Sequence, residues 1–304
     1  MRIGIDLGGT KIEIVALDAT GAARFRHRVP TPQGDYEGTL DAVARLVRDT
    51  ERALGVAPGA CTIGVGTPGS LSAATGLLRN SNSVCLNGRP FKRDLEARVG
   101  RAIRMSNDAN CFAVSEAQDG AAAGAHVVFG VILGTGVGGG IVIDGVALDG
   151  HNGIAGEWGH NPLPWPRDEE RPGSPCYCGR SGCIETFLSG PAFERDHRLQ
   201  AGHDVPTVDI VAQAMAGDAQ AGASLARYEE RLARALAHVI NILDPDVIVL
   251  GGGMSNVTSL YEEVPKQWGA WIFSDRVDTR LVRNVHGDSS GVRGAARLWP
   301  PHAR

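Results

Sequence analysis

Short hydrophobic runs separated by glycine-rich turns recur along the chain, and two of these stretches resemble each other. The segment Gly4–Lys11, followed by Ile12–Asp18, predicts a strand, a tight turn and a second strand. The same arrangement returns 126 residues later, in Gly130–Gly136 followed by Val137–Asp144. This shift places Gly4, Leu7, Gly8 and Asp18 on Gly130, Leu133, Gly134 and Asp144. Two such hairpins predict two similar domains that each offer a glycine turn to a shared cleft; a chance match of glycine-rich strings is the alternative.

The region between the two hairpins alternates helical and strand patterns. An amphipathic helix is predicted over Tyr36–Leu54, and a strand that ends in a turn over Cys61–Pro68. A further helix is predicted through Phe112–Ala123. Alternating strands and helices are typical of the α/β class, which we therefore predict.

The second half of the chain carries the longest helical pattern. Apolar residues recur at helical spacing over Ala223–Leu243, and Pro245 then ends the helix because proline has no N–H to donate. A short buried strand is predicted over Val247–Leu250, and a closing helix over Gly291–Trp299. The proline-rich and charged stretch Asn161–Pro175 predicts a loop.

Two lobes follow from these patterns. We assign residues 1–118 to an N-terminal lobe and residues 119–290 to a larger C-terminal lobe. The last helix, about residues 291–304, is a candidate to return to the first lobe.

Composition and charge exclude several classes of protein. Hydrophobic residues make up 43% of the chain, and the formal net charge of −4 gives no basic surplus for nucleic acid. No stretch approaches the about 20 apolar residues that span a bilayer, and Asp6 interrupts the region where a secretory signal would be apolar. We therefore expect a cytoplasmic protein without nucleic-acid or membrane partners.

The glycine turns are candidate phosphate-binding sites. Glycine allows the backbone to approach phosphate oxygens closely, while Thr10 and Thr135 add hydroxyl donors and Lys11 adds a cation. Neither turn matches a P-loop or a dinucleotide fingerprint, and a single glycine turn is more often only a hairpin. Two equivalent turns and a third glycine run at Gly251–Gly253 favour a nucleotide ligand.

The segment Ser106–Asn110 offers a second chemical group. Asn107 and Asp108 precede the predicted helix, where asparagine and aspartate commonly cap free backbone N–H groups. A carboxylate in this position can also accept the proton of a substrate hydroxyl, which phosphoryl transfer to an alcohol requires. Both interpretations stay open on the residues alone.

Three of the six cysteines form a candidate metal site. Cys176, Cys178 and Cys183 lie within eight residues, and His160 lies sixteen residues upstream, which together would fill a closed tetrahedral zinc site. A loop of free thiols is the alternative, and His151, His197 and His203 compete with His160 as the fourth ligand. The isolated Cys61, Cys85 and Cys111 are interpreted as buried thiols. Glu157 and Glu185 flank the cluster. Polar residues beside a loop are most often solvated, but a loop held rigid by zinc would direct both carboxylates toward a cleft, where they could accept hydrogen bonds from sugar hydroxyls.

These motifs together resemble the ROK family of sugar kinases and repressors. The resemblance covers almost the whole chain, and Gly156–His160 followed by Cys176–Glu185 is its most specific part. It implies the actin-like, hexokinase-like ATPase fold, with two lobes and a central cleft. The repressors carry an N-terminal helix-turn-helix, whereas here the first predicted strand begins at residue 3, which disfavours a repressor. A non-catalytic sugar sensor is disfavoured by the presence of Asp108 and both glycine turns.

The resemblance also implies roles for individual residues. Asp108 would be the general base, and Asn107 would bind the sugar. The further sugar contacts would be Glu157, His160, Glu185, Gly69 and Asn82. A structural zinc would be held by His160, Cys176, Cys178 and Cys183, and Asp6 would orient the phosphates of Mg²⁺-bound ATP through water. The ATP-binding positions would be Gly4, Asp6, Gly8, Gly9, Thr10, Lys11, Leu133, Gly134, Thr135, Gly136, Gly138, Gly251, Gly252 and Gly253.

Within the family, the chain is most similar to bacterial fructokinases of the mannofructokinase type. This similarity lies in Asn161–Trp165 and Cys176–Gly179. It implies transfer of phosphate from ATP to the 6-hydroxyl of D-fructose, by a homodimeric enzyme. A kinase for N-acetylglucosamine or glucose is the nearest alternative, because related kinases share the signature residues.

Overall fold

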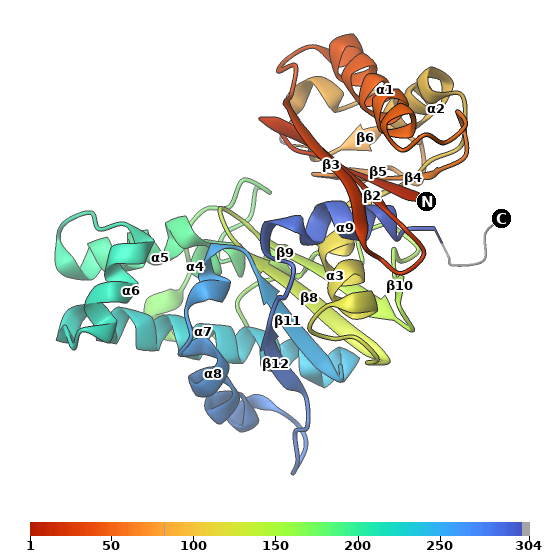
Figure 1. Ribbon diagram of the computed structural model, residues 1–304. Coiled ribbons are helices and arrows are strands. Elements are labelled where there is room, and N and C mark those ends of the chain that lie inside the picture. The colour runs from red at the N-terminus through yellow and green to blue at the C-terminus, as the bar shows by residue number, and fades with distance from the viewer. Residues whose placement is uncertain (82, 300–304) are drawn as a thin grey trace. The chain divides into compact units, whose positions relative to one another are not determined.

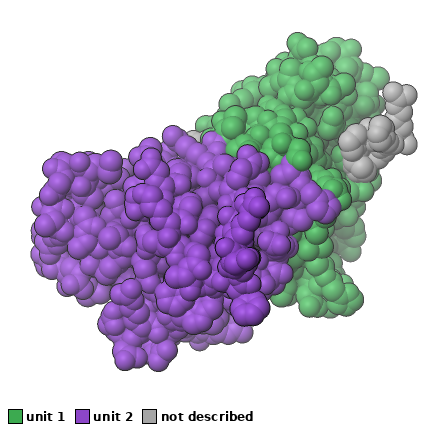
Figure 2. Space-filling model, turned by 90° about the horizontal axis from the view of Figure 1, so that it is seen from below, with its two compact units in different colours: residues 1–124, 140–155, 285–304 green, residues 125–139, 156–284 purple. Residues whose placement is uncertain are grey.

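The computed structural model describes residues 1–81 and 83–299, and the chain forms two compact units (Figure 2). The first unit contains residues 1–124, 140–155 and the end of the chain from 285. The second unit contains residues 125–139 and 156–284. This division differs from the predicted one at residue 118, because residues 140–155 belong to the first unit.

The first unit is built on a mixed five-stranded sheet with the order β3-β2-β1-β4-β7. The strands are β1 (Arg2–Leu7), β2 (Lys11–Leu17), β3 (Ala23–Pro30), β4 (Thr62–Thr67) and β7 (Arg104–Asn107). The helices are α1 (Tyr36–Ala53), α2 (Phe91–Val99), α3 (Asp108–Asp119) and α9 (Ser290–Ala296). A small ribbon of β5 (Ser70–Leu71) and β6 (Leu78–Arg79) and 3₁₀ turns at Val84–Leu86 and Gly287–Ser289 complete it. The predicted α/β class is confirmed.

Successive side chains along each strand point to opposite faces of the sheet. Ile3, Ile5 and Leu7 of β1 point into a core that α1 and α2 cover, with Leu40 and Phe91 among its members. Figure 1 shows α1 and α2 on one face of this sheet and α9 on the other. Burying apolar side chains on one face is what holds these layers together.

The return of the chain to the first unit depends on residues without side chains. A Cβ at Gly4 of β1 would lie 2.1 Å from the carbonyl oxygen of Val292 in α9, and one at Gly294 would lie 1.6 Å from that of Cys111. Glycine at both positions therefore lets α9 pack directly on β1 and α3. The sequence pattern predicted this closing helix, but not the surface on which it packs.

The second unit contains most of a second mixed sheet, whose order is β10-β9-β8-β11-β12. The strands are β8 (Val127–Leu133), β9 (Val137–Ile143), β10 (Val146–Ala147), β11 (Val247–Gly251) and β12 (Arg280–Arg283), and the unit boundary falls within β9. The helices are α4 (Glu185–Leu188), α5 (Gly190–Ala201), α6 (Thr207–Met215), α7 (Ala219–Leu243) and α8 (Leu260–Trp268). Short 3₁₀ turns lie at Trp158–His160, Asp168–Glu170, Gly253–Asn256 and Gly269–Trp271.

The repeated hairpin of the sequence is a repeated topology in the structure. Shifting β2 by 126 residues gives the bounds of β9, and shifting β1 gives those of β8 to within one residue. Each sheet has an antiparallel hairpin on one side and two parallel strands on the other, since β1 pairs in parallel with β4 and β8 with β11. The internal similarity is therefore a duplicated fold and not a chance match of glycines.

Most element bounds agree with the periodicity to within four residues: α7 begins at Ala219, four residues before the predicted start, and α9 ends at Ala296, three residues before the predicted end. Helix α3 begins at Asp108 and ends at Asp119, four residues before the predicted end, because Gly120 follows and Glu116 accepts the N–H of Ala121. The predicted loop Asn161–Pro175 contains one 3₁₀ turn. Among the described residues, no helix is long and apolar enough to cross a membrane.

Candidate functional site: a cysteine-rich metal centre and a polar cavity

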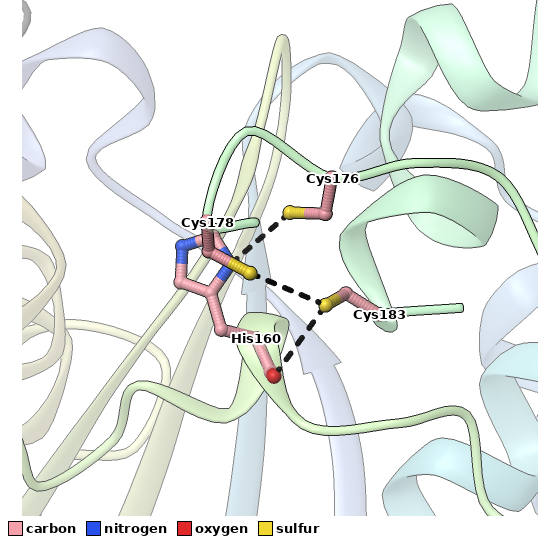
Figure 3. Close-up of side chains that lie close together, drawn as sticks. All are labelled: His160, Cys176, Cys178 and Cys183. Carbon is pink, nitrogen blue, oxygen red and sulfur yellow. Dashed lines mark hydrogen bonds between the residues drawn. The ribbon is translucent and has the colours of Figure 1, made fainter. Parts of the chain in front are cut away.

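The three clustered cysteines and His160 converge in the second unit, as Figure 3 shows. Their ligand atoms all lie within 4.8 Å of one another. The Sγ atoms of Cys178 and Cys183 are 3.6 Å apart, and Cys176 Sγ lies 3.5 Å from His160 Nδ1. A tetrahedral zinc with Zn–S bonds of about 2.3 Å separates its ligand atoms by about 3.5–3.8 Å. The donor set and its spacing fit such an ion, and His160 is the histidine that joins the cysteines.

The second nitrogen of His160 is oriented by a residue that sequence reasoning missed. His160 Nε2 lies 2.9 Å from the hydroxyl oxygen of Tyr177, and the two rings meet edge to face. Metal-binding histidines usually use their other ring nitrogen in such a hydrogen bond, which fixes the ring orientation. Tyr177 stands between two cysteine ligands, and this position is the only signal in the sequence.

The loop that carries the ligands is tied to itself by backbone bonds. Cys176 N–H donates to Arg180 O at 2.7 Å, and isolated bridges join Pro162 to Cys183 and Pro175 to Ser181. These bonds bring the His160 end of the loop against the Cys183 end. A preformed backbone of this kind reduces the conformational entropy lost when the side chains gather around an ion.

A buried ion network anchors the same loop to helix α7. The side chain of Arg234 is fully buried and donates to both carboxylate oxygens of Glu170 and to the carbonyl oxygens of Pro164 and Trp165. Arg231 donates to Glu170 at 2.8 Å. Burial alone would raise the pKa of Glu170, but the hydrogen bonds from the two arginines dominate and lower it to about 2.

Glu185 is held against the turn between β8 and β9, and the segment that carries Glu157 packs on β9. Glu185 accepts the N–H of Val137 at 2.9 Å, so this carboxylate links the metal loop to the predicted phosphate turn. Glu157 precedes Trp158, whose indole N–H donates to Gly138 O at 3.1 Å and whose ring packs on Phe129. The sequence suggested that a rigid loop would hold these carboxylates, but the contact with the turn was not foreseen.

Asp108, the candidate general base, lies in the first turn of α3. Asn107 is the N-cap, and its Oδ1 accepts the N–H of Asn110 at 2.7 Å. The capping interpretation is thus correct for Asn107. Asp108 is the next residue and is exposed, so its carboxylate is accessible from solvent.

Asp108 acts electrostatically on Asp6 of β1. Burial is the largest cause that raises the pKa of Asp6, followed by the negative charges of Asp108 and Glu13, and the pKa reaches about 6. Lys11 and Arg28 oppose this effect. A nearby cation would stabilise the ionised form of this carboxylate, which fits the predicted place of Asp6 beside Mg²⁺-bound phosphates.

A polar cavity of about 170 Å³ lies beside Asn107 in the first unit. Its lining includes Gly69, which has a positive φ and packs so closely on the Arg79–Ser81 backbone that a side chain would not fit. Asn110 and Asp149 also line the cavity, although sequence reasoning did not single them out. Asn110 Oδ1 is buried without a hydrogen-bond partner among the described residues. The predicted sugar contact Asn82 lies outside the described residues.

The glycine positions predicted to bind ATP divide into different environments. A Cβ at Gly134 would meet no atom within 4 Å, so that turn is open, whereas one at Gly8 would lie 3.1 Å from Lys11 O. Gly252 packs on Leu133 at the end of β8, which places the third glycine run beside the second turn. Gly4 faces α9, and its lack of a side chain serves packing.

Comparison with known proteins agrees with this architecture. The model of the ROK family matches residues 2–302. An N-acetyl-D-glucosamine kinase of Photobacterium profundum is 39% identical over 302 residues, covering 98% of this chain and 99% of that protein. The crystal structure of the ROK hexokinase from Thermus thermophilus has a TM-score of 0.85 at 33% identity, covering 98% of this chain and 96% of that one.

A second solved structure shows a relative with bound ligands. It is a ROK family glucokinase from Streptomyces griseus in complex with glucose and AMPPNP, with a TM-score of 0.74 at 29% identity and 98% coverage of both chains. These matches confirm the predicted actin-like, hexokinase-like fold. With a family match over nearly its whole length and relatives of about 40% identity, the chain belongs to the ROK family.

Proposed function

We propose that the protein is an ATP-dependent hexose kinase whose general base is Asp108. The observation that carries the proposal is the exposed Asp108 at the start of α3, next to Asn107 and the polar cavity that Asn107 lines. The full-length similarity to kinases of amino sugars and hexoses supports the same reaction class. Asp108 takes the proton of the attacking hydroxyl while the terminal phosphate of ATP is transferred to it.

Charge neutralisation on the phosphates supplies most of the acceleration in such a reaction. In this proposal the turns around Gly8–Lys11 and Gly134–Gly136 offer backbone N–H groups to the phosphates, and Gly251–Gly253 lies against the adenosine. Mg²⁺ bound to ATP would neutralise part of the phosphate charge. Asp6 would orient the hydrated ion through water. Burial and the negative charges of Asp108 and Glu13 raise its pKa to about 6, and a cation beside it would favour the ionised carboxylate.

We assign zinc to the cluster of His160 and the three cysteines. Four protein ligands leave no open coordination position, so the ion has a structural role. Zinc bound there would hold the segment between Glu157 and Glu185. The proposed sugar ligands of the second unit are these two carboxylates and His160, and those of the first unit are Gly69 and Asn107. Free thiolate ligands suit a reducing compartment, so we also propose a cytoplasmic location. Homodimerisation stays a prediction of the family resemblance.

The acceptor sugar has two candidates, each with its own support. Relatives of 39–40% identity over the full length are named N-acetyl-D-glucosamine kinases, which favours that sugar. The resemblance to fructokinases in Asn161–Trp165 and Cys176–Gly179 favours D-fructose. In the structure these segments build the metal loop, and none of their residues lines the cavity beside Asn107. Their bearing on sugar choice is therefore indirect, and N-acetylglucosamine is the first acceptor to test.

A single assay decides both the activity and the acceptor. ADP formation is measured with ATP and Mg²⁺ across N-acetylglucosamine, fructose, mannose and glucose, and kcat/KM is compared for each. Activity with any of these sugars that Asp108→Asn abolishes supports the kinase. Absence of sugar-dependent ADP formation with all four would contradict it. A lead of fructose over N-acetylglucosamine would keep the kinase and establish the fructokinase assignment.

A further inference from the structure

A larger cavity of the first unit is not used by the proposed reaction. Its volume is about 730 Å³, within the range of about 300–1,000 Å³ that small-molecule sites have. Its walls come from six parts of the chain: the start of β1, helix α2, strand β7, helix α3, the segment from the β9–β10 turn to Asp149, and the residues after α9. All of them belong to the first unit, so the cavity is complete within it.

Positive charge dominates the walls of this cavity. The ionisable residues that line it are four cations and two carboxylates: Arg2, Lys92, Arg104, Arg297, Asp144 and Asp149. Among the residues that the structure describes, neither Arg2 nor Arg104 forms an ion pair with a carboxylate. Lys92 approaches Glu96 only to 4.0 Å. Four cations face two carboxylates in these walls, and this excess of positive charge favours an anionic ligand.

Two of these cations are already held in fixed positions. Arg104 donates to Leu298 O at 3.1 Å, and its guanidinium lies 5.0 Å from the centre of the Trp299 ring. Arg297 donates to Gln118 Oε1 at 3.2 Å and pairs with Asp119. Donors that are ordered before binding lose little entropy when a ligand arrives.

The arrangement also places like charges close together. Burial, and then the positive charges of Arg2 and Arg293, lower the pKa of Arg297, while Asp119 has the opposite effect. An anion between Arg2 and Arg297 would relieve this repulsion. Arginine is well suited to such a ligand because its planar donors match the oxygens of a phosphate group.

The remaining walls can bond a polyhydroxylated body. Ser106, Gln118 and Asp149 offer hydroxyl, amide and carboxylate groups, and Asp149 is positioned by Asn110 Nδ2 at 3.4 Å. Met105 and Val114 add apolar surface. We propose that this cavity binds a small phosphorylated metabolite of the size of a sugar phosphate, with its phosphate at the arginines and its hydroxyls toward Ser106 and Asp149.

Binding here has a route to the site of the proposed reaction. Met105, Ser106 and Asp149 line this cavity and also the smaller cavity beside Asn107. A ligand that orders these shared walls would change the affinity for the acceptor without occupying the acceptor's place. The inference concerns binding and does not require that the kinase proposal be correct.

Isothermal titration calorimetry with ribose 5-phosphate tests the proposal on the full chain. Inorganic phosphate and neutral ribose are titrated in parallel, and each titration is repeated with AMPPNP and N-acetylglucosamine at saturation. We expect ribose 5-phosphate to bind with both partners present, its affinity to fall as salt rises, and ribose not to bind. Equal affinity for inorganic phosphate would assign the site to the free ion. Failure of both phosphate compounds to bind, or their displacement by AMPPNP and the sugar, would overturn the proposal.

Variants then locate the binding site. Lys92→Ala and Arg104→Gln should each weaken ribose 5-phosphate binding about tenfold or more, because each removes a charge-assisted contact. Arg93→Ala is the matched control, since Arg93 lies on the same helix as Lys92 with its side chain 78% exposed and outside the cavity. The side chain of Lys92 is 41% exposed and pairs with Glu96 only at 4.0 Å, so Lys92→Ala should fold and remains informative if Arg104→Gln unfolds. Unchanged binding in Lys92→Ala and in folded Arg104→Gln, or equal loss in Arg93→Ala, would refute the assignment.

Discussion

The buried carboxylate of Glu170 should be a main support of the second unit, and the substitution Glu170→Gln tests this. Glutamine keeps the shape of the side chain, but it removes the charge that faces Arg231 and Arg234. It also turns an amide N–H₂ group toward one of these donors. The side chain of Arg234 is fully buried and that of Arg231 is 10% exposed, so neither charge can be rehydrated easily.

The size of the effect follows from the pKa of Glu170. Its value is lowered from 4.5 to about 2, which corresponds to about 3 kcal/mol of stabilisation in the ionised state. Loss of one partner from a buried ion pair typically costs about 3–5 kcal/mol, which agrees. We therefore expect the thermal midpoint of the variant to fall by about 6–12 °C at pH 7.

The lowered pKa of Glu170 also determines how the stability difference between the wild-type protein and Glu170→Gln depends on pH. Because the folded pKa lies below the unfolded one, the contribution is complete above pH 4.5 and is lost as the pH falls toward 2. The stability difference between the wild-type protein and Glu170→Gln should therefore be complete at pH 7, begin to shrink below about pH 4.5 and vanish only near pH 2. Differential scanning calorimetry at pH 7, 5, 4 and 3.5 measures this decrease.

A matched control comes from the same loop. The side chain of Asp168 is 99% exposed and pairs with Arg171 only at 3.5 Å, so Asp168→Asn should change the midpoint by less than about 1 °C. Glu170→Gln should also release zinc to a chelator faster, since Arg234 holds the carbonyl oxygens of Pro164 and Trp165 in the metal loop. A midpoint within 2 °C of wild type at pH 7, or a difference that persists unchanged at pH 3.5, would refute the reasoning.

Four further predictions concern the proposed reaction and the metal. Asp108→Asn should lower kcat by several orders of magnitude with sugar affinity within about tenfold, and retention of more than about a tenth of kcat would remove Asp108 from the role of base. Gly134→Val should raise the KM for ATP far more than that for sugar, because the turn has room for the side chain and the fold should survive; a defect confined to the KM for sugar would contradict the nucleotide role. Cys178→Ser should reduce the zinc content below the expected one per chain and lower the thermal midpoint, whereas Cys85→Ser should change neither; metal analysis that finds no zinc in the wild-type protein would defeat the assignment. Asp6→Asn should abolish activity but stabilise the ligand-free protein at pH 7.5 by about 1–2 kcal/mol. The reason is that the folded pKa of Asp6 is raised to about 6, so its contribution to the free energy of unfolding is complete below pH 3.8 and is lost as the pH rises through about 6. A variant less stable than the wild-type protein at pH 7.5 would contradict this.

The sequence by itself determined the elements and their repetition. Strand and turn patterns located both hairpins, and helical spacing located α1 and α7, because these signals are written in neighbouring residues. The cluster of three cysteines and His160 could also be predicted from the sequence, since few roles other than metal binding bring such residues so close in a chain.

Only the tertiary structure decided which distant residues meet. Arg234 meets Glu170 from 64 residues away, and no local pattern distinguishes this arginine from others on α7. The close approach of α9 to β1 depends on Gly4, which the resemblance had assigned to ATP. The cavity near Arg2 and Arg104 is assembled from six separate segments of the chain. Such contacts depend on how folded elements pack, and packing selects partners by shape and charge in three dimensions, which short-range sequence patterns do not record.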